Sequence, residues 1–241
     1  MTIGGTEMAE KNKKMTIGRL IRSIVLTSLV FPAVILGLGG SIVWIEGWIF
    51  SLWFIAMILS TVIYMFLKDP DLLAERQKAP GSDNQKRWDV YILYAIFIIS
   101  IIWILIMPLD AKRFGWSPTF PLWLKIIGGL LLILSIYFIF MTTVENTYLS
   151  TRVRIQSDRK QQVISTGVYG FVRHPLYLGY LLLIIGGPLL LGSISGLIFG
   201  LLGIITIVAR IFGEETMLLD ELEDYEEYKQ KVKYRLIPFI W

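Results

Sequence analysis

The stretch Gly167–Gly179 concentrates side chains that can bind a ligand, directly before a long apolar run. The two glycines at its start let the backbone turn tightly. Its proline suits the first turn of a helix, where free N–H groups can bind an anion. Tyr169 and Tyr177 add hydroxyls, and Arg173 and His174 add a cation and a titratable ring. Alone, Arg173 would be a helix-end anchor and His174 a helix cap. Together these groups exceed what the start of a membrane helix needs, so they predict a binding site.

A second charged group follows the apolar run. Arg210 and Glu214 are four residues apart and share a helix face, and Glu215 comes next. An exposed ion pair of this kind contributes little to stability. If the intervening run folds as a hairpin, however, both charged groups return to the same membrane face. Charged groups beside a membrane bundle are costly and usually functional. We therefore predict that the two groups form one site.

Five charge-free apolar runs must position these groups: Ile24–Ile45, Gly47–Leu67, Val90–Leu109, Ile126–Val144 and Leu176–Ala209. A spanning helix needs about 20 apolar residues, so each of the first four fits one span. The last would be about 50 Å long as a single helix, against a bilayer core of about 30 Å. A turn at Leu191–Gly196 would divide it into a hairpin. The runs predict an all-α polytopic transmembrane bundle of about six spans, or five if the hairpin is re-entrant.

The composition agrees with a membrane protein and narrows the chemistry. Hydrophobic residues make up 55% of the 241 residues and charged residues 17%, below the roughly 25% of a soluble domain. The absence of cysteine and the single histidine exclude disulfides, cysteine zinc sites and multi-histidine metal sites. Basic residues are scattered between apolar runs, so we expect no nucleic-acid partner and no metal, but contacts with membrane lipids.

The basic residues also predict an orientation. With six spans, all of them except Lys112, Arg113 and Lys125 fall on the side of the N-terminus. That side includes Lys11, Lys13 and Lys14 near the start of the chain. By the positive-inside rule it is cytoplasmic. We therefore expect a multi-pass protein of the cell membrane with both termini in the cytoplasm.

The polar segments predict shorter elements at that face. A short helix is expected at Leu72–Lys78, between two proline-containing breaks. Leu218, Leu222 and Tyr225 recur at helical spacing behind Glu214, which predicts an amphipathic helix at the membrane surface. The apolar end, 234–241, is expected to pack back against the bundle. Most tryptophans, Trp53 and Trp103 among them, are expected near the membrane–water interfaces.

These motifs together resemble a known family. The pattern Gly-x-Tyr-x-x-x-Arg-His-Pro-x-Tyr-x-Gly, an apolar hairpin, Arg-x-x-x-Glu-Glu and then Tyr225-x-x-Tyr228 is similar to the isoprenylcysteine carboxyl methyltransferase family and to the related membrane phospholipid methyltransferases. The likeness covers roughly 146–238. It implies a methyltransferase-like region at 146–241 behind four N-terminal spans at 1–145, which would serve the acceptor. The stretch between Glu215 and Tyr225 is one residue shorter than is usual and lacks the customary glycine.

The resemblance implies S-adenosylmethionine as the cofactor and methyl donor. Carried over to this sequence, the cofactor-binding residues would be Gln161, Gln162, Val163, Ile164, Gly167, Tyr169, His174, Pro175, Leu176, Tyr177 and Glu214. The catalytic residues would be Arg210, Arg173 and Glu214. Arg210 matches a position that faces the substrate carboxylate in the family. Arg173 is the arginine of the motif and is placed in the same pocket.

The expected reaction is direct methyl transfer to a lipophilic acceptor that enters from the bilayer. A carboxylate acceptor needs no general base, and Arg210 could hold it with a two-pronged guanidinium. An amine or phenol would need a base, for which Glu214 and His174 are candidates. Carboxyl O-methylation is favoured. The alternatives are a phospholipid or amine N-methyltransferase, a sterol-type membrane reductase, and a non-catalytic membrane protein.

Overall fold

The computed structural model describes residues 15–241, and every regular element in that range is a helix. The elements are α1 Ile17–Gly39, α2 Ile45–Lys68, α3 Pro70–Arg76, α4 Arg87–Pro108, the π-helical η1 Leu109–Phe114, α5 Leu122–Glu145, the 3₁₀ turns η2 Ser157–Arg159 and η3 Gly167–Gly170, α6 Pro175–Leu191, α7 Ile194–Glu221 and α8 Tyr225–Lys231. The predicted all-α membrane bundle is confirmed. Lys11, Lys13 and Lys14, used for the orientation, lie outside the described residues.

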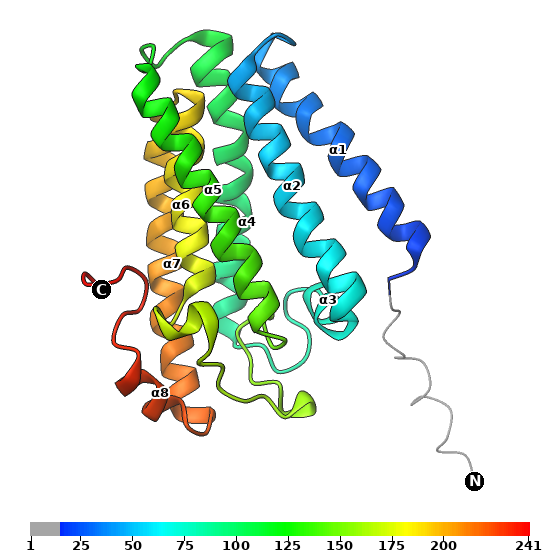
Figure 1. Ribbon diagram of the computed structural model, residues 1–241, viewed down its shortest axis with the longest axis vertical. Helices are drawn as coiled ribbons and strands as arrows, with labels where there is room; N and C mark the ends of the chain where they lie inside the picture. Colours follow the sequence, from blue (N-terminus) through cyan, green and yellow to red (C-terminus); the bar gives the residue numbers. More distant parts are fainter. Residues whose placement is uncertain (1–14) are drawn as a thin grey trace.

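Among residues 15–241, six long helices run up and down through the bundle (Figure 1). Within the same range, five helices are long and apolar enough to span a membrane: α1, α2, α4 continued by η1, α5 and α7. The sixth, α6, is a shorter apolar helix of 17 residues, about 26 Å long at 1.5 Å per residue. It forms the predicted hairpin with α7, and the turn uses Gly192 at a φ of 83°.

Several helix boundaries differ from the limits of the apolar runs. The helix α1 begins at Ile17, where the Thr16 side chain accepts a hydrogen bond from the backbone N–H of Arg19. It ends at Gly39, before the apolar run does, because Gly40 takes a φ of 70°. Because α1 begins before the apolar run, the helix also contains charged residues that precede that run. Capping groups, which hydropathy does not report, set these limits.

The C-terminal part of the chain is also divided differently from the prediction. The helix α7 continues through Glu221, so Glu214 extends this long helix instead of opening a separate one. The chain breaks after it, and Asp224 has a φ of 65°, a conformation that glycine adopts easily and aspartate tolerates. The short helix α8 then begins at Tyr225. The C-terminal helix outside the bundle is present, but it starts later than expected.

Close helix packing places the hairpin in the bundle. A Cβ on Gly128 of α5 would lie 2.8 Å from the Gly186 carbonyl oxygen of α6, so these backbones touch. The indole of Trp53 donates to the Leu132 carbonyl at 2.7 Å, and that of Trp103 donates to the Gly196 carbonyl at 3.0 Å. Both indoles are buried. The prediction that these two tryptophans lie at the interfaces is therefore wrong, because each crosslinks helices inside the bundle.

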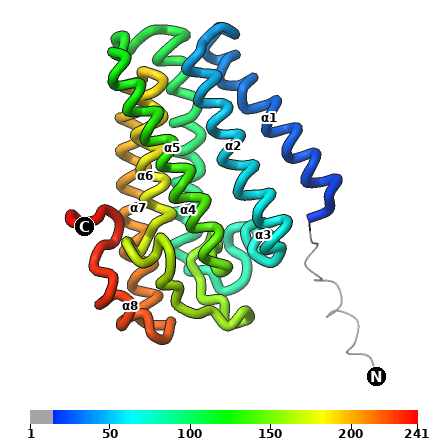
Figure 2. Tube along the Cα trace, viewed as in Figure 1, coloured from blue at the N-terminus to red at the C-terminus, as the bar shows by residue number. Residues whose placement is uncertain are grey.

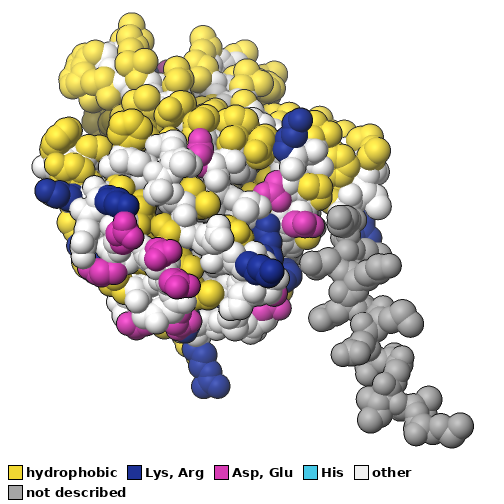
Figure 3. All heavy atoms as spheres, turned by 60° about the horizontal axis from the view of Figure 1, so that its bottom comes forward, with side chains coloured by type: hydrophobic (Ala, Val, Ile, Leu, Met, Phe, Trp, Pro, Cys, Tyr) yellow, Lys and Arg dark blue, Asp and Glu magenta, His cyan; other side chains and the backbone are white. Residues whose placement is uncertain are grey.

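The two ends of the bundle differ. The helices α3 and α8 and the long segment between α5 and α6 lie at one end, with the start of α1 (Figures 1 and 2). The turn between α1 and α2, η1 and the hairpin turn lie at the other end. Seen from the α3–α8 end, acidic and basic side chains are scattered over the near surface, and the part of the bundle behind it is mostly hydrophobic (Figure 3). The segments that carry the predicted site thus meet at the polar end.

Candidate active site

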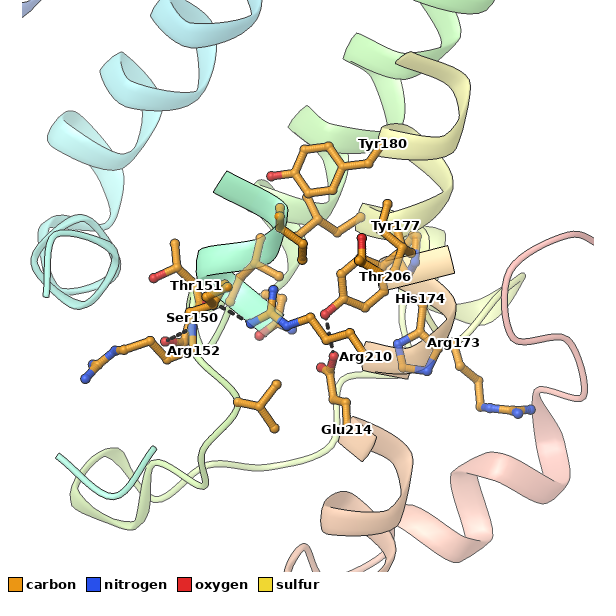
Figure 4. A pocket seen from close by; sticks show the side chains of 18 of the residues that line it. Ser150, Thr151, Arg152, Arg173, His174, Tyr177, Tyr180, Thr206, Arg210 and Glu214 are labelled. Carbon is orange, nitrogen blue, oxygen red and sulfur yellow. Dashed lines mark hydrogen bonds between the residues drawn. The ribbon is translucent and has the colours of Figure 1, made fainter. Parts of the chain in front are cut away.

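A cavity of about 460 Å³ lies where the α3–α8 end meets the bundle. One part is lined by polar and charged side chains from the segment between α5 and α6, the start of α6 and the last turns of α7 (Figure 4). The other part extends between α2, α4, α6 and α7 and is lined by apolar side chains, including Phe50, Trp103 and Phe199. Its volume falls in the range of about 300–1,000 Å³ that is usual for small-molecule sites.

The hairpin brings the two charged groups together, as predicted. The Tyr177 hydroxyl, in the first turn of α6, donates to Glu214 Oε2 at 2.6 Å. Glu215 Oε1 accepts from Arg173 Nε at 2.7 Å and lies 3.2 Å from His174 Nε2. Figure 4 shows the Tyr177 hydroxyl meeting the Glu214 carboxylate in the pocket. Residues separated by the whole hairpin therefore share one site.

Arg173 contacts the C-terminal segment more than the cavity. Its Nη1 donates to the carbonyls of Val232 and Lys233, both at 2.8 Å. Its backbone N–H donates to the Tyr234 carbonyl at 2.9 Å. Figure 4 shows its guanidinium directed away from Arg210 and Glu214. These contacts favour a positioning role, in which Arg173 holds the chain end against the start of α6, and its catalytic role stays a prediction.

Arg210 is held by an aspartate from α4. Its Nε donates to Asp89 Oδ1 at 2.8 Å, and its Nη2 donates to the Thr151 carbonyl at 2.6 Å. Asp89 is fully buried and also accepts from the Val153 backbone N–H at 2.8 Å and from Gln85 Nε2 at 2.7 Å. Nη1 of Arg210 makes no hydrogen bond with any residue that the structure describes. One N–H group of a fixed guanidinium is thus free to bind a ligand.

A buried ion network fixes the segment that follows α5. Glu75 of α3 accepts from Arg152 Nη2 at 2.6 Å and from Arg154 Nε at 3.0 Å. Burial alone would raise the pKa of Glu75, but the hydrogen bonds from Arg154, Ser150 and Lys78 outweigh it and lower the pKa from 4.5 to about 2. Arg152 and Arg154 both line the cavity. This wall of the site is therefore held by charges on an element outside the hairpin.

Tyrosines surround the part of the cavity nearest α8. Tyr169 accepts a hydrogen bond from Asn146 Nδ2 at 2.8 Å, and its carbonyl accepts from the Tyr228 hydroxyl at 2.8 Å. Burial raises the pKa of Tyr169 and of Tyr225 well above the usual range. The Tyr225 hydroxyl is buried and has no hydrogen-bond partner among the described residues. Such an unsatisfied donor beside a cavity is costly unless a ligand or water satisfies it.

Nearly all of the predicted site residues line this one cavity. The residues that do so are Gln161, Gln162, Val163, Ile164, Tyr169, Arg173, His174, Pro175, Leu176, Tyr177, Arg210 and Glu214. Gly167 does not line it. At a φ of 55°, a Cβ on Gly167 would lie 2.3 Å from Glu145 Oε1, so this glycine permits the turn that places Tyr169.

Sequence reasoning missed two lining residues, Tyr225 and Arg76, and the buried acid Asp89 that holds Arg210. Asp89 was left outside the apolar run, although an acid in the first turn of a span is a recognisable signal. Tyr225 was part of the motif but was not assigned to the site. Arg76 of α3 lines the cavity as well, and nothing in its sequence surroundings marks it. Its position depends on how α3 folds back beneath the bundle.

Comparisons with known proteins find similar sequences over the part of the chain that forms much of the cavity wall. A model of the isoprenylcysteine carboxyl methyltransferase (ICMT) family matches residues 124–220. The protein-S-isoprenylcysteine O-methyltransferase of Schizosaccharomyces pombe is 34% identical over 82 residues, which cover 33% of this chain and 35% of that protein. The protein of the same name from Saccharomyces cerevisiae is 35% identical over 135 residues, covering 54% of this chain and 55% of that protein.

The chain therefore spans between about a third and about half of the length of these curated relatives. The match contains α5, the segment after it, and the hairpin with both charged groups. Asp89 and Arg76 lie before it, and α8 lies after it. The region that matches the isoprenylcysteine carboxyl methyltransferase family model, residues 124–220, supplies most of the cavity wall.

Proposed function

We propose that this protein is an integral membrane methyltransferase that uses S-adenosylmethionine to methylate a carboxylate on a lipophilic acceptor. The observation that carries the proposal is the cavity itself. Its polar part holds Glu214, Tyr177 and the free N–H of Arg210, and its apolar part continues into the bundle between α2, α4, α6 and α7. A site of this shape can bind a charged, water-soluble donor and a membrane-soluble acceptor side by side.

The lining residues fit the donor. S-adenosylmethionine carries a sulfonium and an ammonium group, and Glu214 supplies a carboxylate at the cavity. It carries an adenine ring, and Tyr148, Tyr169 and Tyr228 supply aromatic surface on the side of α8. The unpaired buried hydroxyl of Tyr225 needs a hydrogen-bond partner that a ligand could provide. When bound, the donor supplies a methyl group that is already electrophilic, so its transfer to a carboxylate requires no general base.

The chain's own residues then have to bind and orient the two reactants and keep water out of the cavity. Asp89 and the Thr151 carbonyl hold the guanidinium of Arg210 at Nε and Nη2, which leaves Nη1 for the acceptor carboxylate. The apolar walls of the deeper cavity remove the lipid part of the acceptor from water. Fixing two reactants in this way can contribute about 7–11 kcal/mol to lowering the barrier.

Binding of the donor tests the proposal directly. We expect the detergent-purified protein to bind S-adenosylmethionine in calorimetry with micromolar affinity. Glu214→Gln should weaken this binding by at least tenfold, because the donor's positive charge loses its partner. The matched control is Glu223→Gln, which changes an exposed acid just beyond α7 and should bind as the wild type does. No binding by a folded wild-type protein would overturn the proposal.

The acceptor group is tested by the stability of the product. With methyl-labelled donor and an S-prenylated cysteine derivative, we expect label that mild alkali releases as methanol, because an ester hydrolyses. Phospholipid or amine N-methylation is the second candidate, because the Tyr177–Glu214 pair could act as a base. Alkali-stable label on an amine acceptor, with none on the carboxylate, would favour that candidate.

A further inference from the structure

One cationic side chain in the cavity differs from the others. Five arginines line it: Arg76, Arg152, Arg154, Arg173 and Arg210. Four of them have a carboxylate within 3.0 Å of a guanidinium nitrogen: Glu75 for two, Glu215 for the third and Asp89 for the fourth. Among the described residues Arg76 has no carboxylate partner. Its Nη1 donates a hydrogen bond of 3.3 Å to the Leu149 carbonyl.

The backbone that carries Arg76 is firmly placed. The helix α3 begins with Asp69, whose Oδ1 accepts from the Leu72 N–H at 3.0 Å. Leu72 and Leu73 are buried in a cluster with Met65 and Leu149. Arg76 is the last residue of this helix and follows Glu75, which is buried in the ion network. A half-buried cation on such a fixed element is directed at the cavity without an internal counter-ion.

Arg76 and Arg210 approach the same strip of the cavity wall. Arg76 donates to the Leu149 carbonyl, and Arg210 donates to the Thr151 carbonyl two residues later. The positive charge of Arg76 also acts on the Tyr169 hydroxyl, which belongs to the part of the cavity nearest α8. Arg210 is anchored to Asp89 of α4, toward the bundle. The wall thus carries two cationic groups: Arg76, which comes from α3 and acts on Tyr169, and Arg210, which is held by α4.

We propose that Arg76 binds the carboxylate of the methyl donor. This rests on the proposed function, in which the site must hold two carboxylates, one on the donor and one on the acceptor. Arg210 is held by α4, beside the apolar part that would take the acceptor's lipid, and Arg76 acts on Tyr169 in the polar part that would take the donor. A guanidinium with free N–H groups matches a carboxylate in geometry and charge. Arg76 lies before the family-matched region, so it completes the site from the N-terminal half.

The test compares two ligands on purified protein by calorimetry, without catalysis. One is S-adenosylhomocysteine, and the other is its carboxamide analogue, in which a neutral amide replaces the carboxylate. For Arg76→Gln we expect roughly 10- to 100-fold weaker binding of the carboxylate ligand, as for a lost charged hydrogen bond. Binding of the amide should change by less than about threefold. Arg76→Lys should recover part of the loss.

The matched control is Arg87→Gln, which removes the same charge from an exposed residue at the same end of the bundle. It should bind both ligands as the wild type does. Equal losses for both ligands in Arg76→Gln would show a structural effect and overturn the inference. So would an unchanged affinity for S-adenosylhomocysteine with a raised KM for the acceptor, since Arg76 would then serve the acceptor carboxylate. A wild type that binds neither ligand would overturn the proposed function and this inference with it.

Discussion

Arg210 illustrates how a single side chain in this site depends on partners far away in sequence. Its charge is buried, and burying an unpaired charge is very costly. Asp89 offsets that cost and at the same time restricts the guanidinium to one orientation. Asp89 also accepts from the Val153 N–H, so one carboxylate aligns both Arg210 and the neighbouring wall of the cavity. We infer that Asp89 is a positioning residue for the acceptor side.

The first prediction concerns the ion pair between Arg210 and Asp89. In Asp89→Asn we expect kcat/KM for the acceptor to fall by about 10- to 100-fold, the usual effect of losing a charged hydrogen bond. The affinity for S-adenosylhomocysteine should stay within about threefold, because Asp89 does not serve the donor. In an Arg210→Gln background the same substitution should add little, since coupled residues are not additive. Steady-state kinetics and calorimetry on the four proteins measure this.

The control for this prediction is another buried acid. Asp110 is fully buried at the opposite end of the bundle, where its Oδ2 accepts from the Ser193 hydroxyl at 2.7 Å. Asp110→Asn should lower thermal stability. It should not lower kcat/KM for the acceptor while leaving donor affinity unchanged, which is the effect expected of Asp89→Asn. If Asp89→Asn weakened donor binding and acceptor turnover equally, its role would be general stability and not positioning.

At the scale of elements, the short helix α3 does more than connect two spans. Its buried leucines attach it to α2 and to the segment after α5, and Glu75 binds two arginines of that segment. The wall of the cavity that includes Thr151 is thus held from below by α3 and from the side by α4. Charges at this position fix a segment whose own regular structure is limited to the short 3₁₀ turns η2 and η3.

The second prediction follows from Glu75. Removing one partner from a buried ion pair typically costs about 3 kcal/mol or more, because the remaining charges lose their compensation. Glu75→Gln should therefore lower the apparent Tm in detergent at pH 7. The folded-state pKa of Glu75 is lowered to about 2 from an ordinary value of 4.5. Its ionisation therefore stabilises the fold fully above about pH 4.5, and this contribution is lost as the pH falls toward 2.

The measurement is the difference in Tm between wild type and Glu75→Gln across pH. The difference should be constant from pH 7 to about pH 5 and should shrink steadily below that. Glu227→Gln is the control, because Glu227 is an exposed acid paired with Lys231 on α8. A difference that grew on acidification would contradict the predicted sign.

At the scale of the whole molecule, the bundle separates two environments. The polar part of the cavity lies at the polar end, and the helices above it expose leucine, isoleucine and phenylalanine side chains, as in α1 and α4. In the proposed function, the soluble donor would enter from the polar end and the lipophilic acceptor from the surrounding bilayer. The positive-inside rule predicts that the polar end faces the cytoplasm.

The third prediction tests that orientation and uses the absence of cysteine from the sequence. Glu223→Cys places a thiol at an exposed position near α8, and Thr119→Cys places one at an exposed position before α5, at the opposite end. In intact cells a membrane-impermeant maleimide should label only Thr119→Cys. After the cells are opened it should label both. Labelling of Glu223→Cys in intact cells would reverse the orientation.

The sequence by itself determined the fold class and most of the residues that line the polar part of the cavity. Uninterrupted apolar runs allow few arrangements, because a backbone in a bilayer must satisfy its own hydrogen bonds. The long last run had to turn, and a turn necessarily returned Arg210 and Glu214 to the start of α6. Motif residues such as Tyr169 and Tyr177 were therefore placed correctly without coordinates.

Only the tertiary structure decided which residues from the N-terminal half join the site. Arg76 lines the cavity and Asp89 holds Arg210 there because α3 and α4 pack beneath and beside the hairpin, and no local pattern encodes that packing. It also decided that Arg173 holds the chain end and that Trp53 and Trp103 are buried. The physical reason is the same in each case. A side chain's partner is set by distance in the folded bundle, whereas hydropathy and helical spacing report only on neighbours in the chain.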